Sequence, residues 1–334
     1  MSAIENTATN LEAAAARAAD AALERVAAAR AAIGQVVFGQ EAVVAEALIT
    51  VLSGGHGLLV GVPGLAKTKL VETLGTVLGL NERRIQFTPD LMPADILGSE
   101  VLEEGADHRR AFRFVQGPVF AQLLMADEIN RASPRTQSAL LQAMQEGHVT
   151  VAGQRYDLPR PFHVLATQNP IEQEGTYPLP EAQLDRFLMQ IDVPYPDRAA
   201  ERRILVETTG EHDAVARPAM SADDLQSAQR LVRRLPVGDS VVDAILDLVR
   251  SARPGEGGAV AKHIAWGPGP RAAQALMLAT RARALIDGRL SPSADDVKAL
   301  ALPVLKHRMA LSFAARAEGE TIPKVVAGLV ERLG

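Results

Sequence analysis

The segment from residue 57 to residue 79 constrains the fold more than any other part of the chain. It contains an apolar run at 57–60, the turn Gly-Val-Pro-Gly-Leu-Ala at 61–66, and a helix-like pattern that starts at Lys67. A buried strand, a glycine-rich turn and a helix N-terminus, in this order, present converging backbone N–H groups and the positive end of a helix dipole to an anion. The segment therefore predicts a loop that binds phosphate.

In a loop of this kind, individual side chains are expected to contact the nucleotide and its metal ion. The Lys67 ammonium is expected to reach the β- and γ-phosphates, and the Thr68 hydroxyl to ligate Mg²⁺. Ala66 stands where such loops usually have glycine, so the octapeptide alone is a hypothesis that the rest of the chain must support. The residues expected to contact the nucleotide here are Gly61, Val62, Pro63, Gly64, Leu65, Ala66, Lys67, Thr68 and Lys69.

Composition narrows the class of protein. The chain has 334 residues, of which 47% are hydrophobic and 22% charged, and this length predicts about two globular domains. A net charge of −5 argues against a nucleic-acid-binding protein, although an acidic protein can still carry a basic groove. The absence of cysteine excludes disulfides and thiolate chemistry, and it fits a cytoplasmic protein. Charges interrupt the Ala-rich segment 13–33, so we expect an N-terminal helix that does not insert into a membrane.

Short apolar segments alternate with helix-like segments between residues 56 and 191. This alternation predicts an α/β fold, with a mostly parallel sheet covered by helices on both faces. Two inserts, at about 98–117 and 147–158, are not needed to complete the sheet, and the second has the alternating pattern of a hairpin. The expected strands are 57–60, 84–87, 122–126, 163–167 and 187–192, and the expected helices are 68–79, 134–146 and 180–186.

Two prolines, Pro194 and Pro196, mark a boundary after which the pattern is helical almost throughout. We therefore expect an Ala-rich helix over 1–34, an α/β nucleotide-binding domain over 35–196, and a smaller all-α domain over 197–334. The helices expected in the last domain are 198–209, 221–235, 239–252, 270–287, 293–312 and 321–333.

Polar residues follow two of the expected strands. Asp127 and Glu128 end the segment 122–126, and consecutive strand residues point to opposite sides. Asp127 is therefore expected to hold Mg²⁺ through its water shell, while Glu128 polarises a water beside the γ-phosphate. Asn169 follows the strand at 163–167 and is expected to hydrogen-bond the γ-phosphate and the attacking water. The alternative for Asn169 is an ordinary turn residue before a proline.

Several longer segments resemble the MoxR family of AAA+ ATPases. They are Ala-Asp-Glu-Ile-Asn-Arg-Ala at 126–132, Arg-Thr-Gln-Ser-Ala-Leu-Leu at 135–141, and the segments 87–93, 168–170 and 304–308. The resemblance covers about residues 35–315, in the family's order. It implies an AAA+ nucleotide-binding domain with a helical lid, ATP and Mg²⁺ as cofactors, and assembly into a homo-oligomeric ring, with a hexamer as the expected form. It also implies that ATP hydrolysis remodels or activates a client protein, often together with a partner that carries a von Willebrand factor A domain.

The resemblance also implies roles for residues outside the phosphate loop. Arg186 in Leu-Asp-Arg-Phe matches the arginine finger, which enters the site of a neighbouring subunit. Arg271 in Gly-Pro-Arg-Ala matches the second sensor, a lid cation that touches the nucleotide in cis. The alternatives are a local ion pair for Arg186 and a surface position for Arg271, and Arg131 is a further candidate for the interface. The stretch Val37-Phe38-Gly39-Gln40 matches the segment that packs against adenine.

The two inserts resemble the helix-2 insertion and the hairpin before the first sensor of one AAA+ clade. In that clade these elements face the centre of the ring and touch the client. Two alternative functions stay open beside a protein client. A nucleic-acid motor of helicase or restriction type is disfavoured because neither insert combines a basic patch with interleaved aromatics, and Arg109, Arg110 and Arg113 form the only cluster. A nucleotide-dependent binding module is disfavoured because it has no use for the water-activating Glu128.

Overall fold

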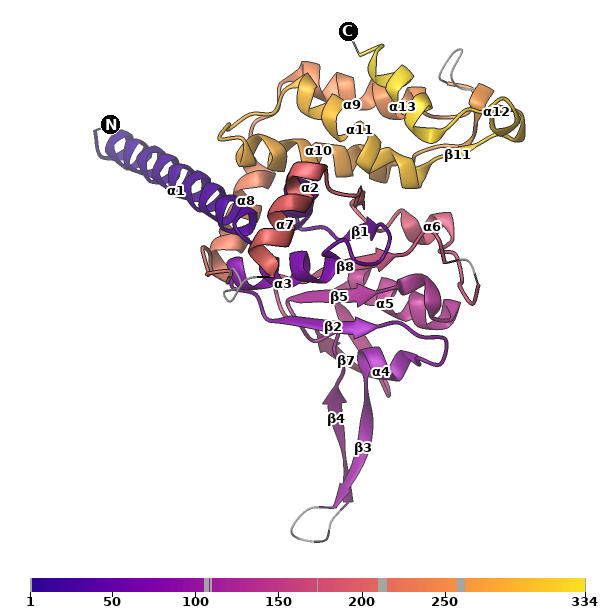
Figure 1. The fold of residues 1–334 in the computed structure, drawn as a ribbon. Coiled ribbons are helices and arrows are strands. Elements are labelled where there is room, and N and C mark those ends of the chain that lie inside the picture. The colour runs from indigo at the N-terminus through magenta and orange to yellow at the C-terminus, as the bar shows by residue number, and fades with distance from the viewer. Residues whose placement is uncertain are drawn as a thin grey trace.

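A five-stranded parallel sheet lies at the centre of the α/β part of the molecule (Figure 1). The computed structural model describes residues 2–104, 108, 110–172, 174–209, 215–256 and 262–333, with side chains from residue 16 onward. The strand order is β2-β5-β8-β1-β9, and every neighbouring pair is parallel, as the sequence predicts. All carboxyl ends therefore meet at one edge of the sheet. The strands are β1 (Gly57–Val60), β2 (Glu82–Gln86), β5 (Leu123–Asp127), β8 (His163–Gln168) and β9 (Met189–Asp192).

The two faces of the sheet bury separate hydrophobic cores. Leu58 belongs to one core and the next residue, Leu59, to the other, because successive strand side chains point to opposite faces. A strand covered on both faces must be apolar at every position, which explains the continuous apolar runs in the sequence. The core around Leu59 includes helices α1 (Ser2–Gly34), α2 (Glu41–Leu52) and α3 (Lys67–Val77), and the core around Leu58 includes α5 (Pro134–Glu146).

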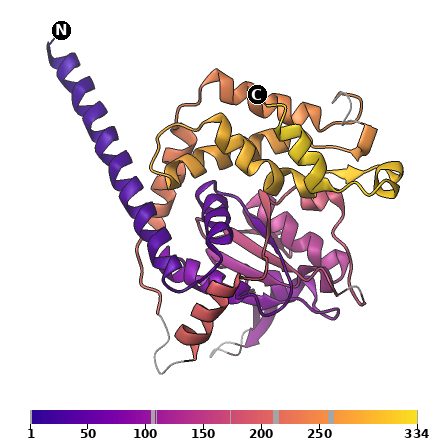
Figure 2. The ribbon, with the colours of Figure 1, turned by 45° about the horizontal axis from the view of Figure 1, so that its top comes forward.

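Helices dominate the chain beyond the sheet, and they form a layer beside it (Figures 1 and 2). The layer packs on the sheet through α10 against α2 and through α11 against β9. One hydrophobic core runs through these contacts, so the division at residue 197 stays a proposal. The helices are α7 (Arg198–Thr208), α8 (Ala222–Arg234), α9 (Asp239–Ser251), α10 (Pro270–Ile286), α11 (Ala294–Leu305), α12 (Phe313–Ala317) and α13 (Ile322–Val330).

The helix expected over 293–312 is shorter than predicted, and the region is not entirely helical. The helix α11 ends at Leu305, near Pro303, which removes one of its hydrogen bonds. A 3₁₀ turn, Lys306–Arg308, follows, and then β11 (Ala310–Leu311) pairs with β10 (Ile264–Trp266). The side chains of the 3₁₀ turn hold it against the segment before β9, so the chain leaves the helical path here.

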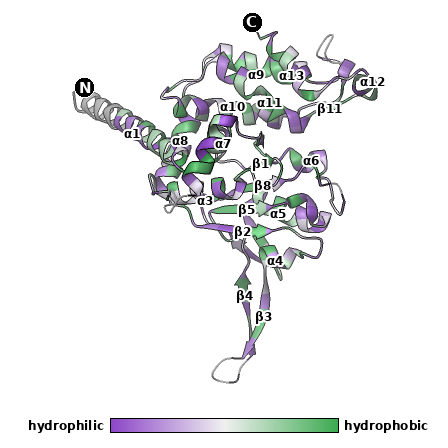
Figure 3. Cartoon of the chain, in the orientation of Figure 1, coloured by the Kyte–Doolittle hydropathy of each residue, from purple (hydrophilic) through white to green (hydrophobic). Residues whose placement is uncertain are grey.

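Both inserts form antiparallel hairpins. The strands β3 (Gly98–Glu104) and β4 (Arg110–Gln116) extend away from the sheet (Figure 1), and β6 (His148–Val151) pairs with β7 (Gln154–Asp157). The hairpins contact each other through Phe114 and Tyr156, whose ring centroids are 4.0 Å apart. In Figure 3 the β3–β4 hairpin carries both hydrophobic and hydrophilic residues. Its residues Leu102 and Phe112 are 53% and 70% exposed, so they are available to contact another molecule.

The N-terminal helix α1 extends well beyond the rest of the molecule (Figure 2). Its last turns are anchored, since Val26, Ala29 and Ile33 are buried in the core. Within the part of the chain that the structure describes, we find no helix with the length and apolar character that crossing a membrane requires.

Candidate nucleotide-binding site

The loop between β1 and α3 lies at the carboxyl edge of the sheet. Gly64 has φ +85°, and Ala66 has the left-handed conformation with φ 56° and ψ 23°. This conformation explains why glycine is usual at position 66, because it costs an L-residue about 1–2 kcal/mol. Ala66 precedes α3 without a side-chain cap, so the first N–H groups of the helix have no acceptor within it. Such N–H groups are suited to bind phosphate oxygens.

Lys67 lies over this loop and within electrostatic reach of two carboxylates. Its ammonium donates hydrogen bonds to the carbonyl oxygens of Gly61 (2.5 Å) and Val62 (3.3 Å). Burial lowers the pKa of Lys67, and the charges of Asp127 and Glu128 act in the opposite direction. The fold therefore brings together the cation and the two carboxylates that the sequence singles out, although Lys67 and Asp127 are 60 positions apart in the chain.

Asp127 and Glu128 are held by residues that the sequence analysis did not identify. Asp127 is 9% exposed, accepts a hydrogen bond from the Thr167 hydroxyl (2.6 Å), and pairs with Arg84 (2.5 Å). The Glu128 N–H donates to the same hydroxyl (2.8 Å), so Thr167 on β8 fixes both residues. The Glu128 carboxylate accepts from Gln86 at 2.7 Å. The polar residues within the expected strands at 84–87 and 163–167 were the signal in the sequence.

Asn169 stands directly beyond β8, which pairs with β1 up to Gln168 and Val60. It therefore lies beside the start of the phosphate loop, as predicted. Its side-chain oxygen also accepts the Ile171 N–H at 3.2 Å, which is the contact expected of a turn residue. A hydrogen bond at 3.4 Å joins its amide to Glu172. The position of Asn169 thus fits a contact with the γ-phosphate and the attacking water, and its hydrogen bond with the Ile171 N–H fits the alternative of a turn residue.

Arg131 has partners within its own chain. Its guanidinium contacts Glu128 at 3.0 Å and Glu172 at 3.9 Å, and these contacts raise its pKa. The contact with Glu128 restrains the carboxylate that is expected to polarise water. The suggested role of Arg131 at a subunit interface stays a prediction.

A cavity of about 300 Å³ adjoins the phosphate loop, and its lining includes Val37, Phe38 and Gln40 of the segment predicted to pack against adenine. The helix α7 supplies another wall, which the sequence analysis missed. Position 39 has no room for a side chain beside α7, since Gly39 has φ +67° and an added Cβ would lie 2.2 Å from the Cβ of Ala200. The guanidinium of Arg203 lies 4.1 Å from the ring centroid of Phe38. The cavity is lined by Val36, Val37, Phe38, Gln40, Gly64, Leu65, Ala66, Lys69, Pro196, Ile204 and Thr208.

Arg186 and Arg271 lie at the opposite edge of the sheet from the phosphate loop. Arg186 precedes β9, and the next segment is joined to the start of β1 by the Leu188 N–H, which donates to the His56 carbonyl at 2.7 Å. Arg271 lies 3.5 Å from Asp185, and it lines a cavity of about 130 Å³ together with Arg186. At about 3.3 Å per residue, β1 separates the two edges by roughly 10 Å. This placement does not favour the expected cis contact of Arg271 with the nucleotide.

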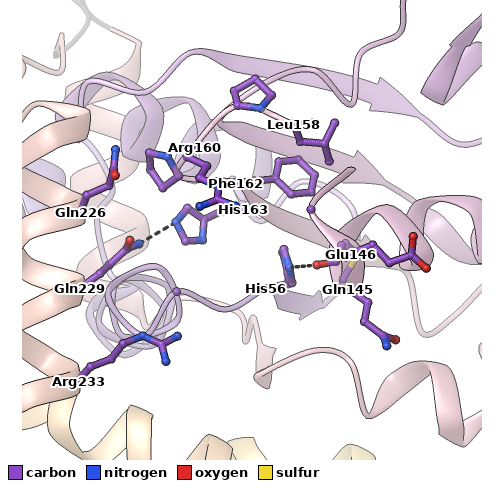
Figure 4. Close-up of a pocket in the computed structure, with 15 residues that line it drawn as sticks. His56, Gln145, Glu146, Leu158, Arg160, Phe162, His163, Gln226, Gln229 and Arg233 are labelled. Carbon is purple, nitrogen blue, oxygen red and sulfur yellow. Dashed lines mark hydrogen bonds between the residues drawn. The ribbon is translucent and has the colours of Figure 1, made fainter. Parts of the chain in front are cut away.

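A larger hollow of about 410 Å³ also lies at this amino edge, and it is formed by residues of α5, β8 and α8 (Figure 4). Figure 4 shows His163 directed at Gln229, with 3.0 Å between their nitrogens, while the other ring nitrogen donates to the Gly55 carbonyl at 2.8 Å. His56 accepts the Val164 N–H and donates to the Met144 carbonyl. Burial lowers the pKa of His56 to about 3 and that of His163 to about 4. Both rings are therefore neutral at pH 7 and join elements of the fold, as expected of packing residues.

Comparison with known protein families finds a match for the part of the chain that forms the sheet and another for the helical part. Residues 56–189 match the ATPase family associated with various cellular activities (AAA), and residues 258–328 match the AAA lid domain. The parallel sheet, the loop after β1 and the carboxylates at the end of β5 thus belong to an AAA+ ATPase with its lid. This class of protein binds a nucleotide.

Individual relatives narrow the class to a family. The chaperone MoxR1 of Mycobacterium tuberculosis is 43% identical over 297 residues, which cover 88% of this chain and 78% of that protein. Protein MoxR of Paracoccus denitrificans is 33% identical, with coverage of 85% and 88%. A crystal structure of a candidate ATPase from Cytophaga hutchinsonii has a TM-score of 0.89 at 36% identity, with coverage of 96% and 98%. The chain belongs to the MoxR family of AAA+ ATPases, which confirms the resemblance seen in the sequence.

Proposed function

We propose that this protein binds ATP with Mg²⁺ and hydrolyses it, and that hydrolysis drives the remodelling or activation of a client protein. The observation that carries the proposal is the convergence of Lys67, Asp127 and Glu128 at one edge of the sheet. A protein that only binds nucleotide needs a cation for the phosphates, but it has no need for a second carboxylate held by donors beside that cation.

The residues present fit the nucleotide and the metal ion. Lys67 and the free N–H groups of α3 would hold the phosphates, and Thr68 and Asp127 would hold Mg²⁺, which neutralises phosphoryl charge. Glu128 accepts the proton of the attacking water, and Asn169 orients that water. The base occupies the cavity between the segment 36–40 and α7, whose lining includes the apolar residues Val36, Val37 and Ile204.

Hydrolysis requires a second copy of the chain in this proposal. Arg186 lies at the amino edge of the sheet, away from the phosphate loop of its own chain. In a ring, with a hexamer as the expected form, that edge faces the nucleotide of a neighbour, and Arg186 stabilises the charge that develops on the phosphoryl oxygens. Arg271 lies on the same edge, so we assign it to the same neighbouring site rather than to a cis contact.

The client is proposed to be a protein, reached through the two hairpins and in some assemblies through a partner with a von Willebrand factor A domain. Exposed apolar residues on β3 and β4 support a protein client. A nucleic-acid motor is less well supported, because Arg110 and Arg113 pair with Glu104 and Glu103 across the hairpin. Arg109 lies outside the described residues. The relative from Mycobacterium tuberculosis is named a chaperone, which agrees with this proposal.

Mixing two inactive variants tests the proposal. Lys67→Ala lacks the phosphate-binding cation but still offers Arg186, whereas Arg186→Ala binds ATP but lacks the finger. Mixed rings are expected to regain part of the ATPase activity, because some interfaces join an intact phosphate loop to an intact Arg186. The two variants carry different tags, and size-exclusion chromatography of the material retained through both tags verifies that mixed oligomers form. Full activity of a dilute monomer, or no recovery in verified mixed oligomers, would overturn the role of Arg186 in trans.

A further inference from the structure

The 3₁₀ turn Lys306–Arg308 holds the segment that carries Arg186. Arg308 is 2% exposed and points from the lid into the amino edge of the sheet. Its Nε donates to the Asp185 carboxylate at 2.7 Å, and its Nη2 donates to the Phe187 carbonyl at 2.6 Å and the Asp185 carbonyl at 3.1 Å. Its Nη1 donates to the carbonyls of Leu188 (3.1 Å) and Val304 (2.6 Å). The guanidinium thus makes five hydrogen bonds, which matches its five N–H donors.

Two further contacts extend this connection. The Nε2 of His307 donates to the Phe187 carbonyl at 3.2 Å, and Lys306 pairs with Asp192 at 2.6 Å. Three successive lid residues therefore bind the segment from Asp185 to Asp192 near both of its ends. This segment contains Arg186 and the whole of β9.

A buried guanidinium is a costly way to attach a lid to a sheet. Charged groups lose hydration when they are buried, and a buried ion pair often stabilises a protein no more than apolar residues of the same volume. Stability alone therefore gives no reason for this side chain. Its fixed fork of donors instead sets the position of a backbone segment, because it binds three carbonyls and one carboxylate of Asp185–Leu188 at once.

The Arg186 side chain differs from its two neighbours in the chain. Asp185 and Phe187 are both bound by Arg308, and the Arg186 N–H donates to the Gln183 carbonyl at 3.1 Å. Among the residues that the structure describes, no carboxylate lies within ion-pair distance of the Arg186 guanidinium. The backbone at this position is thus fixed on both sides, while the guanidinium itself is available to another molecule.

We propose that Arg308 is a positioning residue for Arg186, so that the lid of one chain sets the activity of the site in the neighbouring chain. This inference rests on the proposed function of Arg186 as a finger supplied in trans. A shift of the lid moves Asp185 and Phe187 through Arg308, and Arg186 moves with them. A displacement of about 1 Å in a catalytic group can cost about a hundredfold in rate. The lid therefore acts on hydrolysis in the neighbouring chain through the position of Arg186, in addition to the role proposed for Arg271.

Arg308→Gln tests this proposal because the substitution keeps a polar side chain and removes most of the donors. Rings of this variant alone are expected to hydrolyse ATP about a hundredfold more slowly than the wild type, with ATP affinity within several-fold. Arg316→Gln is the matched control, since Arg316 is an exposed arginine of the same lid, and it is expected to keep wild-type activity.

Two mixtures separate a positioning role from a general defect of the lid. The first mixture combines Arg308→Gln with Lys67→Ala. Here Lys67→Ala supplies a correctly placed Arg186 and Arg308→Gln supplies an intact phosphate loop, so the mixed rings are expected to regain activity. The second mixture combines Arg308→Gln with Arg186→Ala. It is expected to stay inactive, because its only arginine fingers are the displaced Arg186 side chains of the Arg308→Gln subunits. A defect in the variant's own site gives the reverse pattern. That reverse pattern, or equal recovery in both mixtures, would overturn the inference.

The mixture of Lys67→Ala with Arg186→Ala serves as the reference. If this reference regains nothing although mixed oligomers form, the proposed function in trans fails and the role of Arg308 fails with it. If the reference regains activity, the two mixtures judge Arg308 alone. Should Arg308→Gln lose its helical circular dichroism, Asp185→Asn replaces it in both mixtures, because it removes the carboxylate and keeps the carbonyls that Arg308 binds.

Discussion

The two edges of the central sheet differ in how they are built. The carboxyl edge carries short continuous motifs, each at the end of one strand, and their side chains meet because parallel strands end together. The amino edge is assembled from segments that are far apart in the chain, such as Asp185 with Arg271 and Arg308, or His163 with Gln229. The contacts at the first edge thus come from the ends of neighbouring strands, and those at the second from tertiary packing of distant segments.

This difference suggests a division of labour within an oligomer. The carboxyl edge holds the residues that we propose bind the nucleotide. The amino edge holds the residues that we propose complete the site of a neighbouring chain. Substitutions at the first edge should therefore change binding or the chemical step in the same chain. Substitutions at the second should leave binding intact and change the activity of another chain.

Lys67→Ala is expected to have the largest effect. It removes the cation at the phosphate loop, so binding of a fluorescent ATP analogue should fall below detection while circular dichroism stays unchanged. Lys324→Ala, at the N-terminus of α13, is the control, since its ammonium contacts only the Gly319 carbonyl among the hydrogen bonds of the described residues. Unchanged affinity in folded Lys67→Ala protein would remove the phosphate loop from the proposal.

Arg186→Ala is expected to slow hydrolysis by about 10³-fold or more, as loss of an arginine finger does elsewhere. ATP affinity should stay within several-fold of the wild type, because Arg186 lies about one strand length from its own phosphate loop. Steady-state phosphate release together with analogue binding measures both quantities. A loss of affinity as large as the loss of rate would place Arg186 in its own chain's site and remove the contrast between the edges.

Glu128→Gln is expected to slow hydrolysis about a hundredfold while ATP still binds, because the amide cannot accept the proton of water. The amide retains the shape of the carboxylate and can still accept the hydrogen bond from Gln86. Phosphate release in a single-turnover experiment is the measurement. Activity within a few-fold of the wild type would mean that another group activates the water.

The carboxyl edge could be predicted from the sequence to a large extent. At the amino edge, the family resemblance pointed to Arg186 and Arg271, but their contacts could not be predicted. Lys67 and Asp127 follow apolar runs, so the strand and the loop that place them are visible in the chain itself. The contacts of Arg308 depend on the orientation of the lid against β9, which no local pattern specifies. The same holds for α7, since its contact with Gly39 and Phe38 is set by tertiary packing.

The smallest expected effect concerns stability and pH, and it tests the structural character of the amino edge. Burial holds the pKa of His163 at about 4, below its value near 6.5 in the unfolded chain. Between these values the unfolded chain binds a proton that the folded chain does not, so stability is retained above about pH 6.5 and is lost as the pH falls toward 4. By linkage, His163 alone should cost about 2 kcal/mol at pH 5 relative to pH 8.

His163→Gln removes this titration, so its free energy of unfolding should fall less between pH 8 and pH 5 than that of the wild type. Urea unfolding at the two pH values gives the difference, and only the change with pH is compared, because the substitution also alters contacts with Gly55 and Gln229. His108→Gln is the control, since its side chain is 90% exposed. An acid sensitivity equal to that of the wild type would mean that the pKa of His163 is the same in the folded and the unfolded chain. The amino edge would then respond to pH in the range where the nucleotide site works, and the two edges would no longer differ as proposed.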